Sequence, residues 1–252
     1  TVYGVQNTGI SCNPSVTNGY TSTIECCDNT IVLADNSSPA ETQIGIYCIQ
    51  SVTVGSNMDG VTIKGNKISG GQTGGNSVNG ISLYAGLVGG TIKNVIIADN
   101  QNIGSTLNEA CIIRTQAANT VMTNVKIHNN QFKTSGGQCF YALADGATSS
   151  MDGIELLGNT LDGGSTANIR INASGAGSSI TNVLEDNTTF KNVTTSILVA
   201  GTTTTNMLYK SARYAVPMTV TNATYTVLPT LDWIICNRGS TITLTLPAAT
   251  QY

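Results

Sequence analysis

Charged residues are scarce in this chain of 252 residues, where Asp, Glu, Lys and Arg together make up 10%. Soluble domains usually contain about 25%. Because a surface helix needs a charged face, we expect few amphipathic helices. The eleven Lys and Arg are thinly spread and the formal net charge is -3. This balance argues against nucleic-acid binding, which needs a clustered basic surface.

Long apolar runs are also missing. No stretch approaches the ~20 residues that a membrane-spanning helix requires, so we expect a soluble chain without membrane insertion. The sequence begins at Thr1 and nothing near it resembles a signal peptide. We therefore expect a processed or excised piece of a longer protein.

Metal-binding patterns are absent as well. The chain has a single histidine, His128, and no Cys-x-x-Cys pair, so we predict neither a metal site nor a cofactor. An odd number of cysteines fits poorly with a disulfide-stapled secreted protein. We expect most of them to be small buried apolar residues, with the Cys26–Cys27 neighbourhood the favoured place for any disulfide. The seven cysteines are Cys12, Cys26, Cys27, Cys48, Cys111, Cys139 and Cys236.

One short phrase recurs along the chain, as in "VTIKGNKI", "VKIHNNQF", "IELLGNTL" and "VLEDNTTF". Apolar residues alternate within it, which is the period of a strand with one buried face. Corner positions recur at intervals of 37, 34, 30, 29 and 29 residues: Asn29, Asn66, Asn100, Asn130, Asn159 and Thr188. After each corner an apolar residue returns, namely Ile31, Ile68, Ile103, Phe132, Leu161 and Phe190.

A second set of short strands follows the phrases: "IGIYC", "GISLY", "ACIIR", "CFYAL", "NIRIN" and "SILVA". A unit of strand, corner, strand, loop and strand cannot bury its own apolar face, but stacked units can pair their strands in parallel. We predict an all-β fold, a right-handed parallel β-helix of about six coils followed by a small C-terminal β-domain. An antiparallel sandwich is the alternative, although hairpins give strand signals every ~8–12 residues without a repeated motif.

The corner asparagines have a physical reason in this fold. Asparagine tolerates left-handed backbone angles, and its amide can bond to the equivalent amide in the next coil.

The repeat predicts three regions along the chain. Residues 1–20 are an N-terminal cap or the remnant of a longer helix, residues 21–205 are the β-helix, and residues 206–252 are a C-terminal β-region, either a small β-domain or the first part of one.

The repeated "V-x-I-x-x-N-x-I" phrase is similar to the coils of right-handed parallel β-helix proteins, the pectate-lyase-like group that includes polygalacturonases and phage tailspikes. The segment "YTVLPTLDWIICNRGSTITLTLPAA" resembles one found in C-terminal regions of bacteriophage tail proteins. Together the two resemblances cover most of the chain. They indicate a bacteriophage tailspike or tail-fibre protein.

The resemblance implies a homotrimer that binds, and often degrades, a bacterial surface polysaccharide or lipopolysaccharide. It further implies a location in the phage tail, extracellular action, and contacts with other tail or baseplate proteins. In the similar segment, further strands usually follow the "LTLPAA" run. Because this chain stops at Tyr252, we expect a fragment.

Candidate catalytic residues are carboxylates, because glycoside hydrolysis uses a pair of them about 5–5.5 or 6.5–9.5 Å apart. The densest set is Asp145, Asp152 and Glu155. Each of these acids also has an explanation other than catalysis. Lys126 occupies the equivalent place one coil before Glu155, which predicts a surface ion pair. Asp145 and Asp152 are typical turn residues. Whether the chain is an enzyme, such as a polysaccharide depolymerase, stays open at this point.

Candidate sugar-binding residues lie in the second strand set. Tyr47, Tyr84 and Tyr141 could form a stripe across coils, although tyrosine in a strand is also ordinary packing. Glu109, a further catalytic candidate, and Arg114 bracket "ACIIR" and could meet a sugar or a uronate, or be solvated strand ends.

Glu185 stands where an apolar residue is expected. Burying a lone carboxylate costs several kcal/mol, so either the last coil is distorted there or Glu185 lies at an opening end of the core. We favour distortion.

The sequence alone leaves three candidate functions open. The first is a phage tailspike or tail-fibre receptor-binding protein that recognises, and in some members depolymerises, a surface polysaccharide. The second is a secreted, monomeric polysaccharide lyase or glycoside hydrolase. The third is a non-enzymatic structural or adhesive β-solenoid.

Overall fold

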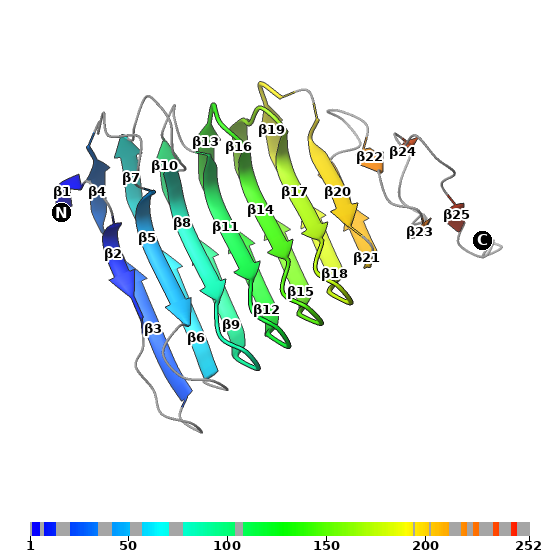
Figure 1. Cartoon of the computed structure of the whole chain (residues 1–252). Helices are drawn as coiled ribbons and strands as arrows, with labels where there is room; N and C mark the ends of the chain where they lie inside the picture. Colours follow the sequence, from blue (N-terminus) through cyan, green and yellow to red (C-terminus); the bar gives the residue numbers. More distant parts are fainter. Residues whose placement is uncertain are drawn as a thin grey trace.

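Each copy of the repeated phrase folds into the end of one strand, a corner and the start of a second strand. Together with a strand of the second set it makes a unit of one strand from each of three parallel sheets (Figure 1). We call this unit a rung. The computed structural model describes residues 2–5, 8–13, 21–34, 42–50, 57–70, 78–103, 108–193, 195–201, 203–211, 218–220, 224–226, 234–236 and 243–245.

The strands of the three sheets follow one another in the chain in a fixed order, A then B then C. Sheet A contains β1 (Val2–Val5), β4 (Thr30–Leu33), β7 (Lys67–Gly70), β10 (Gln101–Ile103), β13 (Gln131–Thr134), β16 (Thr160–Gly163) and β19 (Thr189–Lys191). Sheet B contains β2 (Thr8–Cys12), β5 (Gln43–Gln50), β8 (Val78–Ala85), β11 (Glu109–Thr115), β14 (Gln138–Ala144), β17 (Ala167–Ala173), β20 (Ile197–Gly201), β22 (Met218–Val220) and β24 (Ile234–Cys236). Sheet C contains β3 (Thr21–Cys27), β6 (Asn57–Lys64), β9 (Thr91–Ala98), β12 (Val121–His128), β15 (Ser150–Leu157), β18 (Ser179–Asp186) and β21 (Thr204–Tyr209).

The fold is a parallel β-helix, as the repeat predicted. Sheets A and C each have seven strands, so the described chain makes seven rungs where the sequence indicated about six. Neighbouring strands pair in parallel, as in β9 with β12 and β12 with β15, which excludes the antiparallel sandwich. Figure 1 shows the rungs succeeding one another along one axis from the blue to the yellow end.

The interior consists of columns of apolar side chains. Val61 pairs with Val95, Val95 with Val125 and Val125 with Ile154, and all four are fully buried. Stacking thus gives each rung a dry interior that a single rung cannot make. The register confirms that alternate residues of the phrase face inward.

The corner asparagines form a continuous ladder. The side-chain amide of each donates to Oδ1 of the next, from Asn29 to Asn66, Asn66 to Asn100, Asn100 to Asn130 and Asn130 to Asn159, at 3.0 Å each. The predicted amide bonding between coils is therefore confirmed.

The predicted backbone geometry of the ladder asparagines is wrong by one residue. The left-handed residue at each corner precedes the ladder position, as at Asp99 (φ 55°) before Asn100 and Asn129 (φ 56°) before Asn130. Asn187 (φ 53°) belongs to this set, and Thr188 takes the ladder position beside it. The ladder position is occupied by a residue that can bond to the next rung, and the position before it by one that tolerates positive φ.

Sheet A differs from the expectation at one rung. The column expected to contain Ile103 contains Asn102, which pairs with Ile68 and with Phe132. Asn102 is buried, and its amide donates to the carbonyl of Ala110 at 2.7 Å. A buried amide is tolerated here because it bonds to a backbone oxygen.

Glu185 is buried without any distortion of its strand, so that prediction is wrong. It pairs in register with Leu156 on one side and Tyr209 on the other, and its side chain is fully buried. One oxygen, Oε2, accepts the backbone N–H of Ser211 at 3.1 Å. Burial raises the pKa of this carboxyl above its ordinary value, and hydrogen bonds from Ser211 and Thr188 oppose the shift.

Both ends of the helix extend the sheets. β1 and β2, within residues 1–20, pair in parallel with β4 and β5. The boundary predicted between residues 205 and 206 falls inside β21, which pairs with β18. β22 and β24 continue sheet B, while β23 (Thr224–Thr226) pairs with β25 (Thr243–Thr245). A separate C-terminal domain stays a prediction.

Candidate functional site

The outer face of sheet B carries a groove over its first five strands, β2 to β14. Inward residues such as Cys111 and Ile113 alternate along β11 with Ile112 and Arg114, which lie on the outer side. The cavity has a volume of about 520 Å³. Its lining residues are Thr8, Thr42, Ile44, Tyr47, Asn79, Tyr84, Glu109, Ile112, Arg114, Tyr141 and Leu143.

Strand register explains the shape of the groove. Tyr47, Ser82, Ile112 and Tyr141 occupy one outward column on four successive rungs. The two tyrosines are therefore three rungs apart, ~14 Å by the strand spacing. Ser82 and Ile112 are smaller and buried. The column therefore protrudes from the sheet at its two tyrosines and forms a hollow between them.

Aromatic rings and one guanidinium form the side of the groove nearer the ends of the strands. The rings of Tyr47 and Tyr84 meet edge to face with centroids 5.4 Å apart. The guanidinium carbon of Arg114 lies 5.7 Å from the centroid of Tyr84. Burial raises the pKa of both tyrosines, so their hydroxyls remain protonated donors at neutral pH.

Arg114 is held in place by Asp145. Its Nε donates to both carboxylate oxygens, at 3.0 and 3.1 Å, and a second guanidinium nitrogen also bonds to Asp145. The hydrogen bonds that Arg114 donates to Asp145 raise the pKa of Arg114, which keeps this cation charged. A two-pronged pair fixes the plane of the guanidinium and leaves its remaining N–H groups for a ligand.

Tyr141 is held by two residues of the neighbouring strand β17, Arg170 and Asn172. The guanidinium carbon of Arg170 lies 4.9 Å from its ring centroid, and the amide of Asn172 donates to its hydroxyl at 3.2 Å. Tyr141 is mostly buried, and its ring is held by contacts on both the face and the hydroxyl.

Glu109 stands on the opposite side of the groove, at the start of β11. Burial raises the pKa of its carboxyl, and the positive charge of Arg170 opposes this shift. With its amide nitrogen turned toward Glu109, Asn79 donates to Oε2 at 2.7 Å. The groove thus places acceptors on one side and a fixed cation on the other.

The sequence had named Tyr47, Tyr84, Tyr141, Arg114 and Glu109 as candidates, and the structure brings all five to this groove. It missed Asn79, Thr8 and Ile44, which line the same side as Glu109. These three pair in one column with Glu109, so the alignment of the second strand set could have found them.

The remaining candidate acids are separated. Asp145 is bound to Arg114 beside sheet B, whereas Asp152 and Glu155 lie on β15 of sheet C. Asp152 accepts hydrogen bonds from Thr181 and Asn182. Asp152 and Glu155 are therefore not brought together with Asp145.

The sequence predicted that Glu155 pairs with Lys126, and this prediction of its partner is wrong. Within the described residues, the contact of Glu155 is with His128, whose Nε2 lies 3.6 Å from Oε2 of Glu155. Lys126 is the direct neighbour of Glu155 in register, and His128 lies two residues further along the same strand. His128 is partly exposed at the outer face.

Glu109 and Asp145 do not form a hydrolytic pair. Glu109 pairs in register with Gln138, and Asp145 lies seven residues beyond Gln138 in the chain. At ~3.3 Å per residue their backbones are ~23 Å apart, well beyond the ~9.5 Å limit for paired acids.

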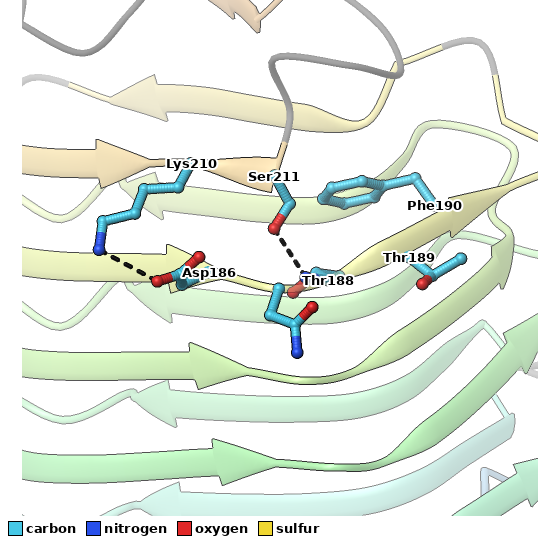
Figure 2. Close-up of a pocket in the computed structure, with 7 residues that line it drawn as sticks. Asp186, Thr188, Thr189, Phe190, Lys210 and Ser211 are labelled. Atoms are coloured by element: carbon cyan, nitrogen blue, oxygen red, sulfur yellow. Dashed lines mark hydrogen bonds and ion pairs between the residues drawn. The ribbon is translucent and has the colours of Figure 1, made fainter.

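A second hollow lies at the last corner of the helix, where Figure 2 shows Lys210 and Ser211 above the corner residues. Its volume is about 460 Å³. Lys210 Nζ lies 3.0 Å from Asp186, and Ser211 Oγ accepts the backbone N–H of Thr188 at 2.7 Å. These bonds join the last rung to the one before it. The polar side chains around this hollow therefore have a structural role.

Two general features of the described residues bear on function. No group of three or more His, Cys, Asp or Glu side chains among them is arranged to hold a metal ion. The part of the chain that the structure describes also contains no helix of the length and apolarity that crossing a membrane demands.

Comparison with known proteins gave no match to a family model, to a curated protein or to a solved structure. The groove itself is therefore the basis for a functional conclusion.

Proposed function

We propose that this chain is a carbohydrate-binding β-helix that recognises a bacterial surface polysaccharide through the groove on sheet B. The observation that carries the proposal is the convergence of three tyrosines, Arg114 and Glu109 on one cavity. Pyranose rings present an apolar C–H face together with hydroxyl groups. Aromatic rings with fixed polar groups between them suit both parts of such a ligand.

The elongated groove suits a chain of sugars better than a compact ligand. It runs along the helix axis across five rungs, from Thr8 on β2 to Tyr141 on β14. Its fixed side chains lower the ordering cost of binding, because Arg114 and Tyr141 are already held by their neighbours.

We further propose that the chain belongs to a bacteriophage tailspike or tail fibre and acts as a trimer on the host surface. The support is the resemblance of the repeated phrase and of the C-terminal segment to such proteins. Trimer formation is tested by the mass in solution, where a monomer at micromolar concentration would favour the secreted monomeric enzyme.

The acids on the groove support binding better than hydrolysis. Glu109 and Asp145 are too far apart, and Asp145 is occupied by Arg114. A depolymerase would release new reducing ends or unsaturated uronates from the polysaccharide. Binding without such products would support a recognition role.

The deciding experiment measures binding of capsular polysaccharide and lipopolysaccharide preparations to the immobilised chain by surface plasmon resonance. Tyr84→Ala is expected to weaken binding about 10-fold or more, as truncation of a central aromatic contact does. Lys133→Ala, on the outer face of sheet A, serves as the control and should bind normally. Equal weakening by both variants, or binding unaffected by Tyr84→Ala, would contradict the groove as the site.

A further inference from the structure

Arg114 lines the groove with one edge of its guanidinium not engaged by Asp145. The hydrogen bonds to Asp145 come from Nε and Nη2, which form one edge of the planar group. The edge between the two terminal nitrogens, Nη1 and Nη2, is not covered by Asp145. The side chain of Arg114 is 26% exposed, so a ligand in the groove can reach it. A group with two acceptor oxygens in one plane matches such an edge.

The guanidinium of Arg114 is fixed before any ligand binds. Asp145 holds its plane, and its central carbon lies 5.7 Å from the ring centroid of Tyr84. An arginine that is already ordered loses less rotamer freedom on binding than a free surface arginine does. Arg114 is therefore suited to binding one specific group rather than to attracting anions in general.

The charges around this edge favour an anionic group. Asp145 balances one positive charge, and Arg170 adds a second beside the groove, where it stacks on Tyr141. Nε of Arg170 is buried without a hydrogen-bond partner among the described residues. Glu109 lies five residues before Arg114 on β11, ~16 Å away by the strand rise. This separation exceeds the screening length of about 8 Å at physiological salt, so Glu109 repels an anion at Arg114 only weakly.

We propose that the groove selects an acidic sugar, whose carboxylate accepts two hydrogen bonds from the terminal nitrogens of Arg114. This inference rests on the proposed function and names the class of sugar that the groove recognises. The acidic sugar lies beside Tyr84, the aromatic neighbour of Arg114. Sugars that adjoin it along the polymer place their hydroxyl groups near Glu109 and Asn79, on the opposite side of the groove.

A carboxylate fits this site better than a phosphate. Its two oxygens are coplanar and it carries a single negative charge, which suits a planar edge whose own charge Asp145 partly balances. A phosphate monoester carries about 1.5–2 negative charges at neutral pH and needs more cations around it. Among the described residues that line the cavity, Arg114 alone is a cation.

Carboxyl reduction of the polysaccharide tests the inference on the unmodified chain. Capsular polysaccharide and lipopolysaccharide preparations that bind the immobilised chain are treated with a carbodiimide and then with borohydride, which converts each carboxylate into a primary alcohol. We expect reduction to weaken binding about 10-fold or more, as the loss of hydrogen bonds to a charged group does. The same preparations treated with borohydride alone are the matched control and should bind normally.

Variants of Arg114 separate this contact from a general effect of charge. Arg114→Gln should weaken binding of the native polysaccharide about 10-fold and leave binding of the reduced polysaccharide unchanged, because both changes remove the same interaction. Arg114→Lys should also weaken binding, since lysine keeps the charge but lacks the planar pair of nitrogens. Lys126→Gln removes one positive charge from the outer face of sheet C and is the matched control, with normal binding expected. Circular dichroism checks that each variant is folded.

Four outcomes would overturn the inference, and they separate it from the proposed function. Undiminished binding after carboxyl reduction, with Tyr84→Ala still weakening it, would overturn the acidic sugar and leave the polysaccharide groove in place. Equal affinity of Arg114→Lys and the parent chain would overturn the two-nitrogen contact. Loss of binding only after removal of phosphate with hydrofluoric acid would overturn the carboxylate. Absence of binding to every preparation would contradict the proposed function and this inference together.

Discussion

The backbone N–H and the side-chain amide of Asn100 both donate to one oxygen, Oδ1 of Asn130, at 3.0 Å each. Asn130 in turn donates its amide to Asn159 and to the carbonyl of Ile97. Each ladder residue therefore satisfies buried groups on the rungs around it, so it affects more than its own corner.

Asn130→Ala should lower the free energy of unfolding by about 3 kcal/mol, because each buried group left without a partner costs about 1–3 kcal/mol. Urea denaturation measures the loss. Gln131→Ala changes the adjacent exposed residue and should alter stability by less than about 0.5 kcal/mol. A loss below about 1 kcal/mol for Asn130→Ala would show that the ladder contributes little.

Ile127→Asp should prevent folding. Ile127 is fully buried between Ile97 and Leu156, where an ionised carboxylate has no partner in the core column. Lys126→Ser changes the neighbouring outward residue and should leave folding and thermal stability nearly unchanged. Circular dichroism and thermal denaturation distinguish the two outcomes. A soluble, cooperatively unfolding Ile127→Asp chain would contradict the register.

Glu185 should make stability depend on pH. Burial raises the pKa of Glu185 in the folded chain, so the folded state holds this proton more tightly than the unfolded state. The resulting stabilisation is complete below the unfolded pKa of about 4.3 and is lost as the pH rises through the raised folded pKa.

Glu185→Gln, which cannot ionise, should therefore unfold at higher urea than the parent chain at pH 7, with the advantage shrinking toward pH 4. Glu25→Gln, at an exposed position of β3, is the control and should leave the pH dependence unchanged. Urea midpoints between pH 4 and 8 provide the comparison. Parallel curves for the parent and Glu185→Gln would contradict the buried carboxyl.

Asp145→Ala should destabilise the chain by about 1–2 kcal/mol at pH 7, since it leaves the half-buried Arg114 without its two-pronged partner. The loss should change little with salt, because partly buried pairs are weakly screened. The pair Lys133–Asp162 at 3.7 Å is a useful contrast, as its lysine is exposed. Lys133→Ala should therefore cost less than about 0.5 kcal/mol by the same urea assay.

Much of the architecture could be predicted because a strand has a period of two and a stacked helix repeats once per coil. The alternation around Val125 and Ile127 identifies the inward face, and the recurring asparagine identifies the corner. The structure differs from the predicted pattern at single polar residues, such as Asn102 and Glu185, which occupy buried positions where apolar residues were expected. Each is stabilised by a specific bond, to Ala110 and Ser211 respectively, that no local pattern reveals.

The candidate site was predictable only as a set of separate residues. Tyr47, Tyr84 and Tyr141 could be placed on strands of one sheet, but the hollow between them depends on Ser82 and Ile112 standing in the same column. The partner of Glu155 depends likewise on side-chain reach, since His128 rather than its direct neighbour contacts it.

The repeat alone determined the coil, its inward face and its corner, because these follow from the local alternation of side chains along a strand. Only the tertiary structure decided which residues of different coils line one groove. The physical reason is that loops of unequal length separate the strands, so neighbours across rungs are defined by hydrogen-bonded register and not by distance along the chain.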